Sequence, residues 1–180
     1  MVDSEMKSYN GSGKLPFSEP FIPRGNGRCY GDSSLNNNIA SMLGHNKALA
    51  LDVKSGIFTC QAGMTLDRVL EITVPNGWFL PVTPGTKFIS IGGAVASNVH
   101  GKNHHFDGCF NDHVVSLELL SASGEILTCS PTENKELFET TSGGMGLTGV
   151  ILQVSFRLKK IESAFIDSKS IKAKNLDELV

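Results

Sequence analysis

Short runs in which hydrophobic and polar residues alternate predict several β-strands along this chain. Residues 48–53 (ALALDV) and 57–63 (IFTCQAG) are two such runs, separated by a tight turn. Residues 113–130 are typical of a hairpin that turns at Ser123-Gly124, and residues 78–82 (WFLPV) of a short buried strand. We therefore expect a chain rich in hairpins.

Two segments in the first half of the chain carry helix signals instead. Residues 65–74 (TLDRVLEITV) place hydrophobic side chains on one face, start at a residue able to cap a helix, and are stopped by Pro75-Asn76-Gly77. Residues 90–101 (SIGGAVASNVHG) start at Ser90 and are unusually poor in large side chains. A glycine pair near a helix start costs roughly 1 kcal/mol per glycine relative to alanine, so something must require the space.

The last part of the chain combines a helix with a long strand. Ser130-Pro131-Thr132-Glu133 pairs a capping box with proline at the first helical position, and the helix NKELFETT (residues 134–141) follows. Residues 149–160 then alternate strictly, which predicts a half-buried strand. Its buried face is expected to carry Val150, Leu152, Val154, Phe156 and Leu158.

These elements favour the α+β class over a doubly wound parallel sheet, because they lack a regular strand–helix–strand rhythm. Residues 1–20 are polar and rich in Gly, Ser and Pro, and we expect an extended N-terminal arm there. Residues 21–162 are expected to form the main domain. Residues 163–180 look like the start of a further, truncated domain.

Composition narrows the possible partners. Hydrophobic residues make up 40% of the 180 residues and charged residues 19%, which is typical of an ordered globular domain. The formal charge is −2, from 16 basic and 18 acidic side chains, and no basic run occurs. Nucleic acid is therefore a poor candidate for the partner.

Cysteine usage and hydropathy bear on the compartment. The 4 cysteines include no C-x-x-C pair, so we interpret them as free thiols, which weakly favours a reducing, cytoplasmic compartment. The first fifteen residues lack the hydrophobic core of a signal peptide, and no hydrophobic run approaches the ~20 residues of a membrane span. An attached partner can still bring the protein to a membrane.

Two glycine segments are candidates for anion binding. The loop Gly25–Gly31 (GNGRCYG) matches neither the dinucleotide fingerprint nor the Walker A loop, but successive small residues can aim several backbone N–H groups at one anion. Pro84-Gly85-Thr86 precedes a second segment, Ser90–Ala94, where a helix N-terminus can carry phosphate. The alternatives are a tight loop between strands and a helix packed closely on a neighbouring backbone. Together the two segments suggest a long ligand with a diphosphate.

Two further segments leave their roles open. His100 and His104 have the i, i+4 spacing of a metal pair, but Gly101 and Asn103 disfavour a helix and no glutamate accompanies them, so we expect no metal. The alternatives are a polar wall of a ligand pocket, or histidines bonded to buried backbone. Residues 142–149 (SGGMGLTG) either approach a ligand or simply end a helix.

These motifs, in this order, resemble a known family. PRGNGRCYGDSSLN, VTPGT with SIGGAVASNVHGKNHH, and GGMGLTGVI are similar to the FAD-binding domain of the vanillyl-alcohol oxidase (PCMH-type) superfamily, over residues 23–160. HGKNHH followed by Asn111 and His113 is the most specific part. The resemblance implies two α+β subdomains with FAD between them and a separate substrate domain, which is largely absent here.

The resemblance also implies the roles of particular residues. The first loop would wrap the diphosphate, residues 97–100 would run beside the isoalloxazine, and Ile151 would lie near the adenine. His100 and Lys102 are the catalytic candidates, although the substrate contacts and the base of such enzymes come mainly from the substrate domain. Cofactor contacts are assigned to Arg24, Gly25, Asn26, Gly27, Arg28, Cys29, Tyr30, Gly31, Asp32, Ser33, Pro84, Gly85, Thr86, Ser90, Ile91, Gly92, Gly93, Ala94, Ser97, Asn98, His100, Gly101, Gly146, Gly149 and Ile151.

Two departures from the family pattern affect these expectations. Members with covalent flavin carry a histidine where this chain has Arg28, so we expect FAD to be held non-covalently. Only about twenty polar residues precede the first glycine loop, so the first lobe is expected to be incomplete.

By resemblance, the function is oxidation of a secondary hydroxyl of a sugar-type substrate by hydride transfer to flavin. A polyprenyl-phosphate ribose is the implied substrate, with a short-chain reductase as a further partner. Two alternatives stay open: an alditol or aldonolactone oxidase, and a truncated flavin-binding module without activity.

Overall fold

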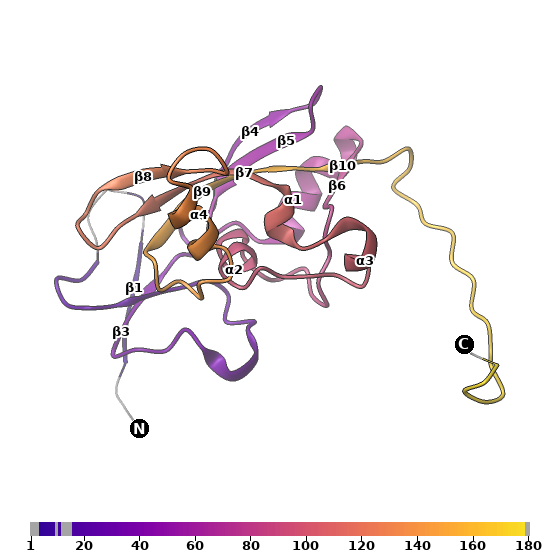
Figure 1. Ribbon diagram of the computed structural model, residues 1–180, viewed down its shortest axis with the longest axis horizontal. Helices are drawn as coiled ribbons and strands as arrows, with labels where there is room; N and C mark the ends of the chain where they lie inside the picture. The colour runs from indigo at the N-terminus through magenta and orange to yellow at the C-terminus, as the bar shows by residue number, and fades with distance from the viewer. Residues whose placement is uncertain (1–3, 10, 12–15, 179–180) are drawn as a thin grey trace.

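The larger part of the molecule is an antiparallel sheet of five strands. The computed structural model describes residues 4–9, 11 and 16–178. The sheet has the order β4-β5-β9-β7-β8 (Figure 1) and consists of β4 (Ala48–Asp52), β5 (Ile57–Gln61), β9 (Val150–Arg157), β7 (Val114–Leu120) and β8 (Ile126–Cys129). The two predicted hairpins, β4–β5 and β7–β8, are confirmed, and β9 joins them at the centre of the sheet.

A second sheet is formed by the N-terminal part of the chain. Its three strands have the order β1-β3-β2 and pair in parallel; they are β1 (Glu5–Ser8), β2 (Ile22–Arg24) and β3 (Asn38–Ser41). Residues 5–8 therefore form a strand within the segment expected to be an arm. The predicted glycine loop lies in the connection from β2 to β3, because parallel neighbours need a long connection between them.

Helices and short turns cover and connect these sheets. The structure contains α1 (Leu66–Thr73), α2 (Ile91–Ala96), α3 (His104–Asp107), α4 (Lys135–Thr141), and three 3-10 turns, η1 (Tyr30–Asp32), η2 (Val74–Asn76) and η3 (Phe110–His113). A third, minimal sheet pairs β6 (Trp78–Phe79) with β10 (Lys159–Lys160). The predicted α+β class is confirmed.

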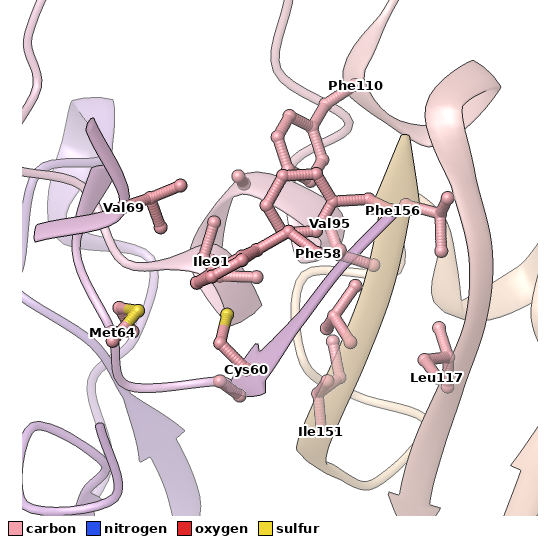
Figure 2. Close-up of a cluster of buried hydrophobic side chains, with 14 of the residues drawn as sticks. Phe58, Cys60, Met64, Val69, Ile91, Val95, Phe110, Leu117, Ile151 and Phe156 are labelled. Carbon is pink, nitrogen blue, oxygen red and sulfur yellow. The ribbon is translucent and has the colours of Figure 1, made fainter. Parts of the chain in front are cut away.

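The main core lies between the five-stranded sheet and helices α1 and α2 (Figure 2). Ile91, Ala94 and Val95 of α2 are fully buried in it, as are Leu66 and Val69 of α1. The amphipathic face predicted for α1 is confirmed. The cap is different, because the Thr65 hydroxyl donates to the Asp67 carboxylate rather than accepting from the helix backbone.

A β-bulge changes the predicted face of β9. Glu118 pairs with Gln153, whereas the next residue, Leu119, pairs with Ile151, so Leu152 is the extra residue. Val154, Phe156 and Leu158 enter the main core as expected, together with Ile151. Val150 and Leu152 instead join a second cluster with Tyr9, Met42 and Leu120. The single alternating face is therefore wrong, and the bulge packs the parallel sheet against the larger one.

The predicted start of α4 is also wrong. Ser130 Oγ accepts hydrogen bonds from the N–H groups of Thr132 and Glu133, at 3.2 and 3.0 Å, but these residues form only a turn. Asn134 has φ 46°, a left-handed conformation that cannot continue a right-handed helix, so the helix begins only at Lys135. A further domain was expected to begin in residues 163–180, and the described part of that segment, 163–178, contains no helix or strand.

Candidate cofactor site

A cleft of about 740 Å³ brings the predicted glycine segments together. This volume lies within the roughly 300–1,000 Å³ of small-molecule and cofactor pockets. Eighteen of the predicted cofactor residues line it: Gly25, Asn26, Gly27, Arg28, Cys29, Tyr30, Ser33, Pro84, Gly85, Thr86, Ser90, Gly92, Gly93, Ser97, His100, Gly146, Gly149 and Ile151.

Direct contacts join the segments that form this cleft. The side-chain amide of Asn26 donates a hydrogen bond from its Nδ2 to the Phe88 carbonyl oxygen at 2.8 Å. A methyl group on Gly25 would overlap the Ser90 hydroxyl, and one on Gly146 would lie 3.4 Å from Pro23. The loop Gly25–Gly31, the segment before and at the start of α2, and the segment 142–149 are thus packed against one another. Glycine is needed at Gly25 because a side chain there has no room.

The first glycine loop lines the cleft with backbone N–H groups that have no acceptor among the described residues. None of the N–H groups from Gly25 to Arg28 donates a hydrogen bond to any residue that the structure describes. Gly27 has φ +59°, the left-handed conformation that turns successive N–H groups toward one side. Arg24 does not line the cleft. Its Nη1 donates a hydrogen bond to the Ser34 carbonyl oxygen at 2.9 Å, and this bond links the two ends of the loop.

Helix α2 offers no such donors. Ile91 N–H donates to the Met64 carbonyl and Gly92 N–H to the Ala62 carbonyl, each at 2.8 Å, and Gly93 N–H donates to Ser90 Oγ at 3.3 Å. The N–H groups that were expected to bind phosphate at this helix N-terminus therefore already have acceptors within the protein. A methyl group on Gly92 would lie 3.0 Å from Ala62 Cβ, so the alternative of close packing is correct, and α2 serves as a wall of the cleft.

The remaining predicted residues lie outside the lining. Ile91 and Ala94 are completely buried in the core. Asn98 accepts from the Asn111 N–H at 3.2 Å, and Gly101 is buried against Thr83. Six predicted residues that the structure describes do not line the cleft: Arg24, Gly31, Ile91, Ala94, Asn98 and Gly101. The side chain of Asp32, which was also predicted, lies outside the described part of the chain.

The sequence analysis missed eight lining residues. They are Pro23, Ser34, Met42, Ala62, Ile89, Ala96, Val99 and Met145. Most are hydrophobic residues beside a predicted segment, and extending each segment by a few positions would have found them. Met42 and Ala62 follow strands β3 and β5, and no local signal marks them, because strand pairing alone brings them to the cleft.

The electrostatics of the cleft suit an anion. Arg28 and His100 line it, and none of the lining residues whose side chains the structure describes is acidic. The Ser33 hydroxyl donates to the Cys29 thiol at 3.3 Å, and this hydrogen bond lowers the pKa of that thiol, with help from the N–H groups of Ser33 and Ser34. Burial beside α2 instead raises the pKa of Cys60 to about 12.

The histidine segment reaches the cleft through one side chain. His100 lines it, whereas Lys102 is exposed and does not. His104 Nδ1 lies 3.0 Å from the Gly101 carbonyl oxygen, as the alternative of histidines bonded to backbone predicted. Among the described residues, no group of three or more His, Cys, Asp or Glu side chains is arranged to hold a metal ion.

The fold and the cleft define an α+β domain for a nucleotide cofactor with a diphosphate. The sequence matches the family described as FAD binding domain over residues 17–130, and the chain belongs to this family. Its cofactor is FAD. The residues fit this group, since Gly25 to Arg28 line the cleft with N–H groups that donate to no described residue, and the described lining residues include Arg28 but no carboxylate.

Three relatives show the range of the family. The chain is 37% identical to decaprenylphosphoryl-beta-D-ribose oxidase of Mycolicibacterium smegmatis over 162 residues, covering 88% of this chain and 35% of that protein. It is 30% identical over 113 residues to D-arabinono-1,4-lactone oxidase of Yarrowia lipolytica, covering 63% and 20%. It is 27% identical over 145 residues to D-lactate dehydrogenase of Anaerostipes hadrus, covering 78% and 30%. The chain thus spans about a third or less of the length of these relatives. No helix among the described residues has the length and hydrophobicity of a membrane span.

Proposed function

We propose that this chain is the FAD-binding part of an oxidoreductase that oxidises a secondary hydroxyl of a sugar-type substrate. The observation that carries the proposal is the first glycine loop, whose residues Gly25 to Arg28 line the cleft with N–H groups that donate to no described residue, where no described acidic side chain is among the lining residues. Backbone donors in this arrangement bind a diphosphate without needing a charged side chain for each oxygen.

Each part of the cleft has a role in this proposal. The N–H groups of Gly25 to Arg28 bind the diphosphate. Gly92 and Gly93 form a wall of the cleft and, having no side chains, leave room for the cofactor beside it. Ile151 and Met42 supply hydrophobic surface to the lining of the cleft. Arg28 stands where a covalent attachment would need a histidine, so FAD is held non-covalently.

When bound, FAD supplies a hydride acceptor, which is the difficult part of such a reaction. The chain's own contribution is to bind and orient the cofactor and to leave its reactive edge accessible. His100 is the imidazole that lines the cleft, and we assign it to that edge, with Lys102 beside it on the surface. Removal of the hydroxyl proton needs a base within hydrogen-bond reach, which a substrate domain would supply with the other substrate contacts.

The substrate assignment rests on the relatives. The identity to the ribose oxidase covers most of this chain and favours a polyprenylphosphoryl ribose. The keto product of that oxidation would need a reductase to complete an epimerisation, and a short-chain reductase is the partner we assign. The lactone oxidase relative keeps an aldonolactone as the second candidate.

A spectroscopic titration tests the proposal. Purified chain mixed with FAD should gain a flavin absorption band that stays with the protein on gel filtration, and acid precipitation should release all of the flavin into solution. In a protein that also carries a substrate domain, anaerobic addition of polyprenylphosphoryl ribose should bleach the band, whereas D-arabinono-1,4-lactone should not. Protein that takes up no flavin contradicts the cofactor assignment, flavin that precipitates with the protein contradicts non-covalent binding, and bleaching by the lactone alone selects the second candidate. Flavin that is bound but bleached by neither compound favours a module without activity of its own.

A further inference from the structure

A chain of polar contacts ties the histidine segment to the last strand of the domain. Lys159 Nζ, in β10, lies 3.0 Å from Asp107 Oδ2 at the end of α3. The same carboxylate oxygen accepts a hydrogen bond from Asn103 Nδ2 at 2.7 Å. Asn103 Nδ2 also donates to the Pro81 carbonyl at 2.9 Å. Three segments that are distant in sequence are thereby held together at one end of the molecule (Figure 1).

This network fixes the backbone that carries His100. His104 follows Asn103 directly, and its Nδ1 lies 3.0 Å from the Gly101 carbonyl oxygen. The rings of His100 and His104 meet edge-on with their centroids 5.3 Å apart. Gly101 is buried against the Thr83 backbone, so the segment cannot shift without losing several contacts at once.

Several features of Asp107 indicate that it anchors this segment. Its carboxylate binds Lys159 and Asn103, and its carbonyl oxygen lies 2.6 Å from His113 Nε2. The hydrogen bond from Lys159, followed by that from Asn103, lowers the pKa of Asp107, so the carboxylate stays charged near neutral pH. Lys160, the next residue in β10, has no ion pair among those found in the described part of the chain, which makes it a matched control.

We propose that Asn103, Asp107 and Lys159 are positioning residues that hold His100 at the edge of the cofactor cleft. The consequence for FAD rests on the proposed function, because it assumes that the flavin lies beside His100. The placement of His100 itself does not, and it can be measured in the protein without FAD. A network that only stabilised the surface would leave the imidazole of His100 unaffected.

The experiment compares Lys159→Met with Lys160→Met in the full chain. The His100 imidazole resonances, assigned with His100→Gln, should shift in Lys159→Met, stay in place in Lys160→Met, and return in Lys159→Arg, which keeps the ion pair. Asp107→Leu removes the carboxylate that binds both Lys159 and Asn103, so it should shift the His100 resonances further. Asp107→Asn keeps an acceptor for Asn103, so it serves if the leucine variant does not fold. Unchanged His100 resonances in Lys159→Met and in the Asp107 variant would overturn the proposal.

A second measurement uses FAD. The absorption maximum of bound flavin should move in Lys159→Met but not in Lys160→Met, and the Kd of FAD should rise about two- to fivefold, the range that an ion pair of this exposure allows. An unshifted flavin spectrum together with shifted His100 resonances would overturn only the link to FAD. If the wild-type chain takes up no FAD, the proposed function fails, and the resonances alone still decide whether the network positions His100.

Discussion

The two glycine segments of the cleft look alike in sequence but differ in what their backbone offers. From Gly25 to Arg28 the N–H groups donate to no residue among those described, so they remain available to a ligand. In α2 the N–H groups of Ile91 and Gly92 already donate to carbonyl oxygens at 2.8 Å. Glycine supplies a left-handed conformation at Gly27 of the first segment, whereas at Gly92 of the second it allows close packing.

This difference teaches that a glycine-rich helix start is not by itself an anion site. The donors of such a helix are free only if no neighbouring strand or loop accepts from them. Here the residues after β5 supply the acceptors, through the carbonyls of Ala62 and Met64. The accounting of backbone hydrogen bonds, rather than the glycine count, is the reason we propose the first loop as the diphosphate site.

Replacing Gly27 by valine should have the largest effect on FAD binding. Gly27 has φ +59°, which strains any residue with a Cβ, and that Cβ would lie 2.5 Å from the Arg24 guanidinium, which would have to shift. A β-branched residue is a genuine outlier in this conformation. Since hydrogen bonds to charged groups contribute about 1.5–3 kcal/mol each, the loss of two should raise the Kd of FAD at least about a hundredfold, measured by flavin fluorescence.

Gly31→Val is the matched control for that variant. Gly31 has φ +73°, but it does not line the cleft and a Cβ there would meet nothing within 4 Å. The backbone strain should therefore be similar, about 1–2 kcal/mol, without the loss of the donors. Equal losses of FAD affinity in the two variants would show that strain in the loop, and not its cleft-facing donors, explains the effect.

Gly25→Ala should have an intermediate effect, and it should lower the free energy of unfolding more than it disturbs the N–H donors of the loop. The added methyl group overlaps the Ser90 hydroxyl, and overpacking of this kind costs about 1–3 kcal/mol. Ser90→Gly removes the obstacle and, as an N-cap change to glycine, should itself cost only a few tenths of a kcal/mol. Urea unfolding of the double variant should recover most of the lost free energy of unfolding; no recovery would mean that the two segments do not pack as described.

The cysteines should report the smallest effect, a difference in labelling rates. The Ser33 hydrogen bond lowers the pKa of Cys29, so its thiolate forms at lower pH than the usual 9.0, whereas burial raises the pKa of Cys60 to about 12. Because the thiolate is the nucleophile, iodoacetamide at pH 8 should label Cys29 at least about tenfold faster than Cys60, and FAD should slow only the former. Peptide mass spectrometry separates the sites, and labelling of Cys29 that FAD leaves unchanged would place the cofactor elsewhere.

Much of the fold was predictable because local patterns determined it. Alternation and turn residues located the β4–β5 and β7–β8 hairpins, and Ser90 marked the start of α2, where its side chain does accept from Gly93. Most of the cleft lining was predictable for a similar reason, since glycine segments are visible in the sequence. Their convergence on one cleft followed from the family resemblance together with two separate glycine motifs.

The parts that were missed depend on contacts between distant residues. The bulge at Leu152 follows from how β7 and β9 align, and no pattern within β9 reveals it. The N–H groups of α2 looked free in sequence, because their acceptors follow a strand some thirty residues earlier. The helix did not start at the expected capping box, because Asn134 adopts a left-handed conformation that its sequence context did not indicate.

The most direct test of the central claim is an amide NMR titration with ADP, which carries the diphosphate without the flavin ring. The amide protons of Gly25 to Arg28 should move downfield as they begin to donate to phosphate oxygens. Those of Ile91 and Gly92 should stay in place, since they already donate to protein carbonyls. Downfield movement confined to Ile91 and Gly92, with the first loop unaffected, would contradict the account.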